Sequence, residues 1–152
     1  ASYRLVKTLW DPRTQEELRT RIRSLRADTP ARWGRFTCPQ MVVHITDAFA
    51  LYSGELSCAA RWTPARYPPL KQAIVYLMPF PKNVPTAPEL LARTPGRWED
   101  EIVRLEKALT AFISQRDRTE WPAHPIFGRL SGRAYGVLAY RHTDHHLRQF
   151  GA

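Results

Sequence analysis

The sequence is poor in cysteine and has no long apolar segment. Its 152 residues include two cysteines, Cys38 and Cys58, which are too few for a disulfide framework and favour a reducing compartment. The longest apolar run, residues 73–80, is far shorter than the roughly 20 residues that span a bilayer. The N-terminal residues also lack the continuous apolar stretch of a secretion signal. These absences predict a cytoplasmic protein without a membrane partner.

Several familiar motifs are absent as well. The sequence contains no glycine-rich phosphate-binding loop, no H-E-x-x-H motif and no paired C-x-x-C motifs. Nucleotide binding and zinc binding of the best-known kinds therefore have no support. No segment alternates between apolar and polar residues with a period of two, so we expect no β-sheet.

Acidic residues are scarce relative to basic ones. The chain has 23 Lys+Arg against 14 Asp+Glu, a formal charge of +9, and its lysines stand only at 7, 71, 82 and 107. Nucleic-acid-binding proteins share such a balance. Because the arginines are spread over all segments, we favour a solvated surface, and nucleic-acid binding driven by charge remains a less favoured alternative. Hydrophobic residues make up 43%, which supplies the core of one domain over residues 1–152.

Apolar residues recur with helical spacing in four segments. Asp11 followed by Pro12 predicts the start of a helix over residues 12–27. Thr37 and Gln40 form a capping box at the start of a second helix that ends near Gly54. The spacing predicts a third helix over residues 95–115 and a fourth from Ser131 to about residue 149. We therefore predict an all-α fold, a four-helix bundle.

A long connection separates the second and third helices. Its roughly forty residues hold eight of the 13 prolines, and loops of this length in a compact domain are usually functional or carry short structure. We expect two short helices there, one over about residues 69–77 and one that opens with a capping box from Thr86 to Glu89.

The five histidines carry the clearest functional signal. His142 and His146 are four residues apart on a predicted helix, so both project from one face, and His44 lies on the inward face of the second helix. Three neutral imidazoles from two helices can hold one metal ion with an open fourth position, as in catalytic zinc sites. The competing interpretation is that these are hydrogen-bonded core histidines.

The sequence around these histidines resembles the DinB-like superfamily. Residues 32–47 read RWGRFTCPQMVVHITD and resemble its second-helix motif, in which Trp and Gln precede a metal-binding His. Residues 140–149 read YRHTDHHLRQ and resemble its C-terminal H-x-x-x-H helix. PKNVPTAPEL (81–90) and WPAHPIFG (121–128) are similar to an uncharacterised bacterial branch. The resemblance covers nearly the whole chain.

The resemblance implies a four-helix bundle in which His44, His142 and His146 bind a divalent metal, usually zinc or nickel. Characterised relatives include transferases that use low-molecular-weight thiols and a thiol-dependent isomerase. We therefore expect a metal-dependent hydrolase or thiol transferase acting on a small-molecule substrate, with a low-molecular-weight thiol as a further cofactor candidate. The proline-rich crossover departs from the better-known members. A non-catalytic bundle that binds a metal or small ligand is the alternative, and a homodimer stays open.

Other polar residues near the histidines have smaller predicted roles. Asp47 lies one turn after His44, and we take it as the candidate catalytic residue that orients His44 or a bound water; solvated helix polarity is the other interpretation. Gln149 extends the histidine stripe and is expected to hydrogen-bond at the site mouth. Asp144 and His145 point to the flank of the same helix. His124, between two prolines, is expected mainly to structure its loop.

Overall fold

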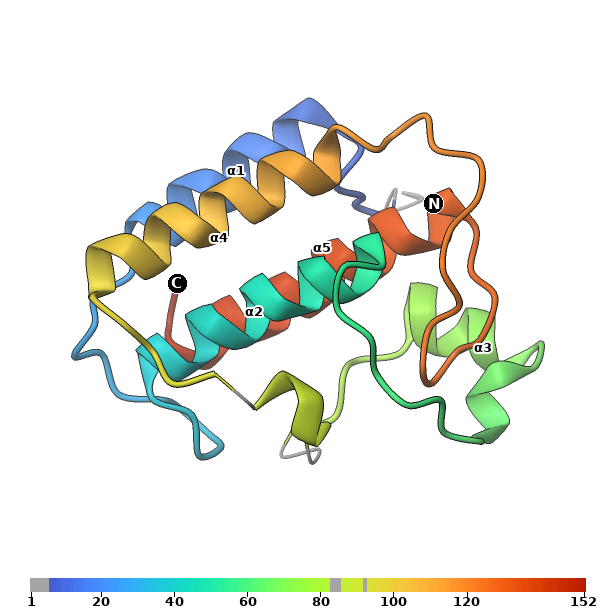
Figure 1. Ribbon diagram of the computed structural model, residues 1–152, viewed down its shortest axis with the longest axis horizontal. Helices are drawn as coiled ribbons and strands as arrows, with labels where there is room; N and C mark the ends of the chain where they lie inside the picture. The colour runs from blue at the N-terminus through green and yellow to red at the C-terminus, as the bar shows by residue number, and fades with distance from the viewer. Residues whose placement is uncertain (1–5, 83–85, 92) are drawn as a thin grey trace, which may run out of the picture.

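The computed structural model describes residues 6–82, 86–91 and 93–152 (Figure 1). No β-strand forms in these residues, and their one β-type contact is an isolated bridge between His124 and Gly128. The predicted all-α class is therefore confirmed for the part of the chain that the structure describes. No helix in this part has the length and apolar character needed to cross a membrane.

The described residues include four long helices, which supply most of the core. They are α1 (Pro12–Arg23), α2 (Cys38–Ser53), α4 (Trp98–Ile113) and α5 (Gly132–Gln149). Helices α1 and α4 lie side by side, as do α2 and α5 (Figure 1), and α2 also packs on α4 and α1 on α5. The helices thus surround one core. Its fully or almost fully buried side chains include Leu18, Ile22, Met41, Ile45, Phe49, Leu105, Leu109, Phe112, Leu138 and Leu147.

The ends of α2 follow from its sequence. The Thr37 hydroxyl accepts a hydrogen bond from the Gln40 N–H (3.3 Å), and the Gln40 side-chain oxygen accepts one from the Thr37 N–H (2.9 Å). This reciprocal pair is the predicted capping box. The helix ends at Gly54, whose φ of +87° is a conformation that glycine adopts without strain. His44 is therefore held on a helix with two well-defined ends.

Two helices, α1 and α4, are shorter than predicted. Helix α1 ends at Arg23 rather than at residue 27, because Ser24 takes the C-cap position and its hydroxyl donates to the Arg21 carbonyl at 2.7 Å. Helix α4 begins at Trp98 rather than at Pro95, with Arg97 as N-cap. At the end of α1 the apolar spacing continues to the buried Leu25, so periodicity alone extends this helix too far.

The described residues of the crossover from α2 to α4 form four short elements. They are η1 (Pro64–Arg66), α3 (Leu70–Gln72), the π-helical η2 (Ala73–Leu77) and η3 (Pro88–Leu90). Elements α3 and η2 confirm the helix predicted over residues 69–77. The capping box predicted from Thr86 to Glu89 is wrong, because η3 is a single 3₁₀ turn whose N-cap is Ala87, without a side-chain cap. Element η1 was not predicted.

The crossover is attached to α5 beside the histidines. The guanidinium of Arg141 donates to the carbonyls of Ile74 (2.6 Å), Val75 (2.7 Å) and Met78. These carbonyls belong to η2 and to the residue that follows it, where a helix end leaves acceptors without partners. One arginine therefore fixes the end of η2 next to His142.

Candidate metal centre

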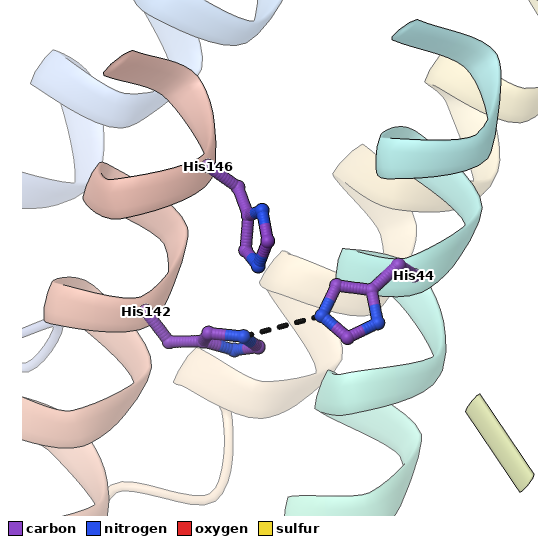
Figure 2. Close-up of side chains that lie close together, drawn as sticks. All are labelled: His44, His142 and His146. Atoms are coloured by element: carbon purple, nitrogen blue, oxygen red, sulfur yellow. Dashed lines mark hydrogen bonds between the residues drawn. The ribbon is translucent and has the colours of Figure 1, made fainter. Parts of the chain in front are cut away.

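The structure brings together the three histidines that the sequence singles out. His44 comes from α2, and His142 and His146 come from successive turns of α5. One ring nitrogen from each lies within 4.8 Å of the others, and Figure 2 shows a nitrogen of every ring facing a shared point. His44 is buried, with 4% of its surface exposed, and the other two are partly buried.

The spacing of the ring nitrogens suits one small ion. The Nε2 atoms of His44 and His142 are 3.2 Å apart. Nitrogens that bind one tetrahedral zinc at about 2.0–2.1 Å lie roughly 3.3 Å from each other. The His44–His142 pair therefore already has the separation that a shared zinc requires, and the third nitrogen lies within 4.8 Å of both.

Gln149 determines which nitrogen of His146 faces this point. Its amide NH₂ donates to the Trp33 carbonyl at 2.9 Å, so its oxygen is the atom that lies 2.8 Å from His146 Nδ1. A carbonyl oxygen only accepts, so Nδ1 carries the proton and Nε2 keeps its lone pair. Metal-binding histidines are commonly oriented by such a second hydrogen bond. Gln149 is buried and lies behind the ligand, not at the site mouth as predicted.

The Tyr52 hydroxyl stands behind the His142 ring, whereas the His44 ring has no such partner among the described residues. The Tyr52 hydroxyl lies 3.0 Å from His142 Nδ1, which leaves His142 Nε2 directed at the shared point. His44 Nδ1 is buried without a hydrogen-bond partner among the described residues. The Leu90 backbone opposes the drop in the pKa of His44 that burial causes. The role of Tyr52 was not predicted, although the residue lies on the same helical stripe as His44.

Burial keeps the three imidazoles neutral. Desolvation, followed by the charge of His146, lowers the pKa of His44 to about 3. Desolvation also lowers the pKa of His146 to about 4, against an opposing effect of the Gln149 hydrogen bond. The pKa of His142 falls well below its ordinary value for the same main reason. Neutral imidazoles with free lone pairs are the form that binds a metal, so this donor set fits a divalent ion.

Asp47 lies one turn after His44 but faces another partner. Its carboxylate oxygen is 4.0 Å from Arg93 Nε, and no hydrogen bond joins it to any of the three histidines, all of which are described. Arg93 also donates to the fully buried Glu101 at 2.7 and 2.8 Å. Burial raises the pKa of Asp47, and Arg93 partly offsets that rise. Asp47 is therefore close to the site in sequence and turned toward an Arg93–Glu101 pair.

Aromatic rings surround the histidines. The Phe36 ring packs on His44 at 5.1 Å and on His146 at 5.8 Å between ring centroids. The Phe80 ring, from the crossover, lies 6.2 Å from His142. Neither residue was predicted, because both belong to segments without helical periodicity. These rings make the surroundings of the site apolar, which strengthens electrostatic interactions within it.

The remaining flanking residues take structural positions. Asp144 pairs with Arg21 at 2.9 Å and with Arg148 at 3.2 Å. His145 is partly buried and packs against Trp33.

His124 has the loop role that was expected. Its Nδ1 accepts hydrogen bonds from the backbone N–H groups of Ile126 (3.1 Å) and Phe127 (3.3 Å). It is not one of the clustered histidines.

Neither cysteine has the properties of an activated thiol. Both are free. Cys38 is buried at the first turn of α2, and desolvation raises its pKa to about 11. The helix dipole, which lowers thiol pKa values at such positions, is therefore outweighed by burial. The pKa of Cys58 is also raised, by desolvation and by Glu89, which its thiol contacts at 3.3 Å.

Comparison of the chain with protein-family models, with curated proteins and with solved structures finds no match. The likeness to the DinB-like superfamily therefore rests on the motifs of this sequence and on the grouping of its histidines.

Proposed function

We propose that this protein is a DinB-like, metal-dependent enzyme that acts on a small substrate by hydrolysis or by transfer of a low-molecular-weight thiol. The observation that carries the proposal is the convergence of three neutral histidine nitrogens from α2 and α5 within 4.8 Å. Three such ligands leave a fourth position for a reacting molecule, as catalytic sites do. A zinc or nickel ion held there would lower the pKa of a bound water toward about 7 or hold a thiol as thiolate.

The chain's own residues would prepare this site in three ways. Gln149 and Tyr52 hold two of the rings from behind. Phe36 and Phe80 cover the rings with apolar surface, which excludes water. Asp47, whose carboxylate faces Arg93 in this structure, is our candidate for the catalytic carboxylate, and burial raises its pKa toward that of a useful base.

Metal content tests the first step of the proposal. Protein purified without a histidine tag should contain close to one equivalent of zinc or nickel by elemental analysis. H142A and H146A should lose it, because two remaining imidazoles bind far more weakly than three. H145A is the matched control, since it removes a histidine from the same helix that is not among the three clustered ones, and it should keep the metal. Equal metal content in H142A and H145A would refute the site.

Reaction class and the role of Asp47 require a second experiment. The loaded protein is screened against ester, amide and electrophilic substrates with and without glutathione, bacillithiol and mycothiol. Turnover that requires the thiol identifies a transferase, and turnover without it identifies a hydrolase. D47N should then lower kcat about a hundredfold with unchanged metal content. Metal binding with no turnover in any arm would favour a non-catalytic binding bundle.

A further inference from the structure

A cluster of aromatic side chains with one positive charge lies beside the three histidines. Its members are Trp33, Phe80, Lys82 and His145, and we call it the Lys82 cluster. The Lys82 ammonium lies 4.4 Å from the centroid of the Trp33 ring. The His145 ring packs against Trp33 at 5.5 Å and against Phe80 at 5.8 Å. Lys82 is exposed and the three rings are partly exposed, so dissolved molecules can reach the cluster.

The Lys82 cluster is continuous with the candidate metal ligands. The Phe80 ring lies 6.2 Å from the His142 ring, and the His145 ring lies 5.2 Å from the His146 ring. The backbone of Trp33 is also tied to the site, since its carbonyl accepts the hydrogen bond of Gln149. A small molecule resting on the cluster would therefore lie next to the histidine nitrogens.

The charge of Lys82 is not compensated by a carboxylate. Residues 56–88 contain no Asp or Glu at all. No described carboxylate lies within 4.0 Å of the Lys82 ammonium, and the residues outside the described ranges include no acidic one. Lys7, by contrast, pairs with Glu17 at 2.9 Å. An exposed ammonium held over an aromatic ring keeps its attraction for an incoming anion.

The acidic residues nearest to the histidines along the chain are already paired. Asp47 faces Arg93, and Asp144 contacts Arg21 and Arg148. Three neutral imidazoles contribute no negative charge, so a divalent ion bound by them would keep its charge of +2. The electrostatics of this region therefore favour an anion, and the rings favour an apolar body attached to it.

We propose that the Lys82 cluster is the binding site for a small anionic substrate with a ring-sized apolar body. The carboxylate or a similar anionic group is bound by the Lys82 ammonium, and the body lies against Trp33 and Phe80. This inference names the substrate class of the proposed function and rests on it for the reaction, whereas binding to the cluster itself does not require the metal.

Benzoate tests this proposal, with benzamide as its uncharged counterpart. Calorimetric titrations are made on the metal-free and on the zinc-loaded protein. The wild type should bind benzoate about tenfold more tightly than benzamide, as expected for one charge-assisted hydrogen bond. K82M should abolish this preference and leave benzamide binding unchanged, whereas K82R should retain it. The matched control is K107M, which removes the same charge from an exposed position on α4.

Each outcome decides one question. If K82M and K107M weaken benzoate binding equally, the effect is one of net charge and the inference is wrong. It is also wrong if the wild type does not prefer benzoate, since Lys82 then only holds the crossover against Trp33. If the preference depends on Lys82 but no zinc binds, the anion site stands and the proposed metal-dependent function fails.

Discussion

Gln149 connects the candidate ligand His146 to the backbone of the loop before α2. Its amide is oriented by the Trp33 carbonyl and in turn fixes the protonation of the imidazole. Q149L removes the acceptor for His146 Nδ1 and leaves the Trp33 carbonyl without its donor. We expect a loss of zinc affinity of about 10- to 100-fold, the usual effect of removing a residue that orients a ligand, measured by competition with a chelating indicator.

Two further variants, one at Gln149 and one at a distant glutamine, separate the orientation of His146 from packing. Q149E keeps an oxygen acceptor for His146 and should retain most of the zinc affinity. Q115L removes an amide that bonds to Ser53 on another part of the molecule and should have no effect. Zinc affinity in Q149L equal to that of the wild type would show that the Gln149 hydrogen bond does not prepare the ligand.

The residues of the candidate site differ in how far the sequence predicts them. His44, His142 and His146 follow from helical spacing, because i, i+4 residues share a face and the inward faces of two helices meet. The position of Gln149 behind its ligand was missed, since it depends on the Trp33 carbonyl in a loop of unpredictable shape. Lys82 was missed as a site residue for the same reason. Spacing therefore finds side chains on helices and misses those that loops supply.

At the scale of elements, Arg141 attaches the crossover to α5. Its guanidinium donates to three carbonyls of η2 and of the residue that follows it. The Arg141 Cζ also lies 4.9 Å from the centroid of the Phe80 ring. R141M keeps an apolar stem but removes these bonds. A hydrogen bond from a charged donor contributes about 1.5–3 kcal/mol, and less where the donor is partly solvated, as the Arg141 guanidinium is. We therefore expect amide exchange in residues 73–80 to accelerate at least tenfold in R141M.

Hydrogen exchange followed by mass spectrometry measures this effect by segment. The core of α4 should exchange as slowly as in the wild type, because the change is local. R133M provides the control, as Arg133 is an exposed residue of α5 whose guanidinium lies over the Tyr76 ring without carbonyl bonds. Unchanged protection of residues 73–80 in R141M would show that the crossover is held by its apolar contacts alone.

The long helices were predictable because their start signals are local. Asp11–Pro12 and the Thr37 capping box start helices as expected, and Ser131, near which the fourth helix was expected to begin, is the N-cap of α5. The end of α1 was less accurate, because Leu25 continues its apolar spacing into a loop and is buried in the core. The start of α4 was also less accurate, since the helix begins at Trp98 and not at Pro95. The crossover was only partly predicted, because its shape depends on bonds to α5 and to the loop of residues 121–131, which are distant in sequence.

For the molecule as a whole, the charges are distributed less evenly than the arginine positions suggest. Acidic residues are missing from two long stretches, 56–88 and 121–143. These stretches pack together, since the Arg61 N–H donates to the Pro125 carbonyl and Lys71 to the Arg129 carbonyl. These two contacting stretches therefore supply basic residues and no acidic ones of their own, although Glu89 lies against Cys58 of the first stretch. Lys82 belongs to the first of these stretches. The net positive charge of the stretch and the Lys82 ammonium therefore both attract an anion.

Buried neutral histidine makes the stability of the whole fold depend on pH. Desolvation, followed by the charge of Arg66, lowers the pKa of His124 to about 4 from the ordinary value of 6.5. Below pH 6.5 the unfolded chain therefore binds a proton that the folded chain does not. The contribution of His124 to stability is complete above pH 6.5 and is lost as the pH falls toward 4, on the order of 2 kcal/mol by pH 5.

H124N isolates this contribution. The asparagine oxygen can accept the backbone hydrogen bonds of Ile126 and Phe127 in place of Nδ1, and the amide does not titrate. Urea unfolding of the metal-free protein at pH 7 and pH 5 should show a smaller loss of stability for H124N than for the wild type, by about 2 kcal/mol. The quantity compared is the change in the free energy of unfolding between pH 7 and pH 5. Any destabilisation by the smaller side chain that is equal at both pH values therefore cancels. Equal losses in both proteins would mean that His124 becomes protonated without cost in the folded state, in conflict with its buried position and its two N–H donors.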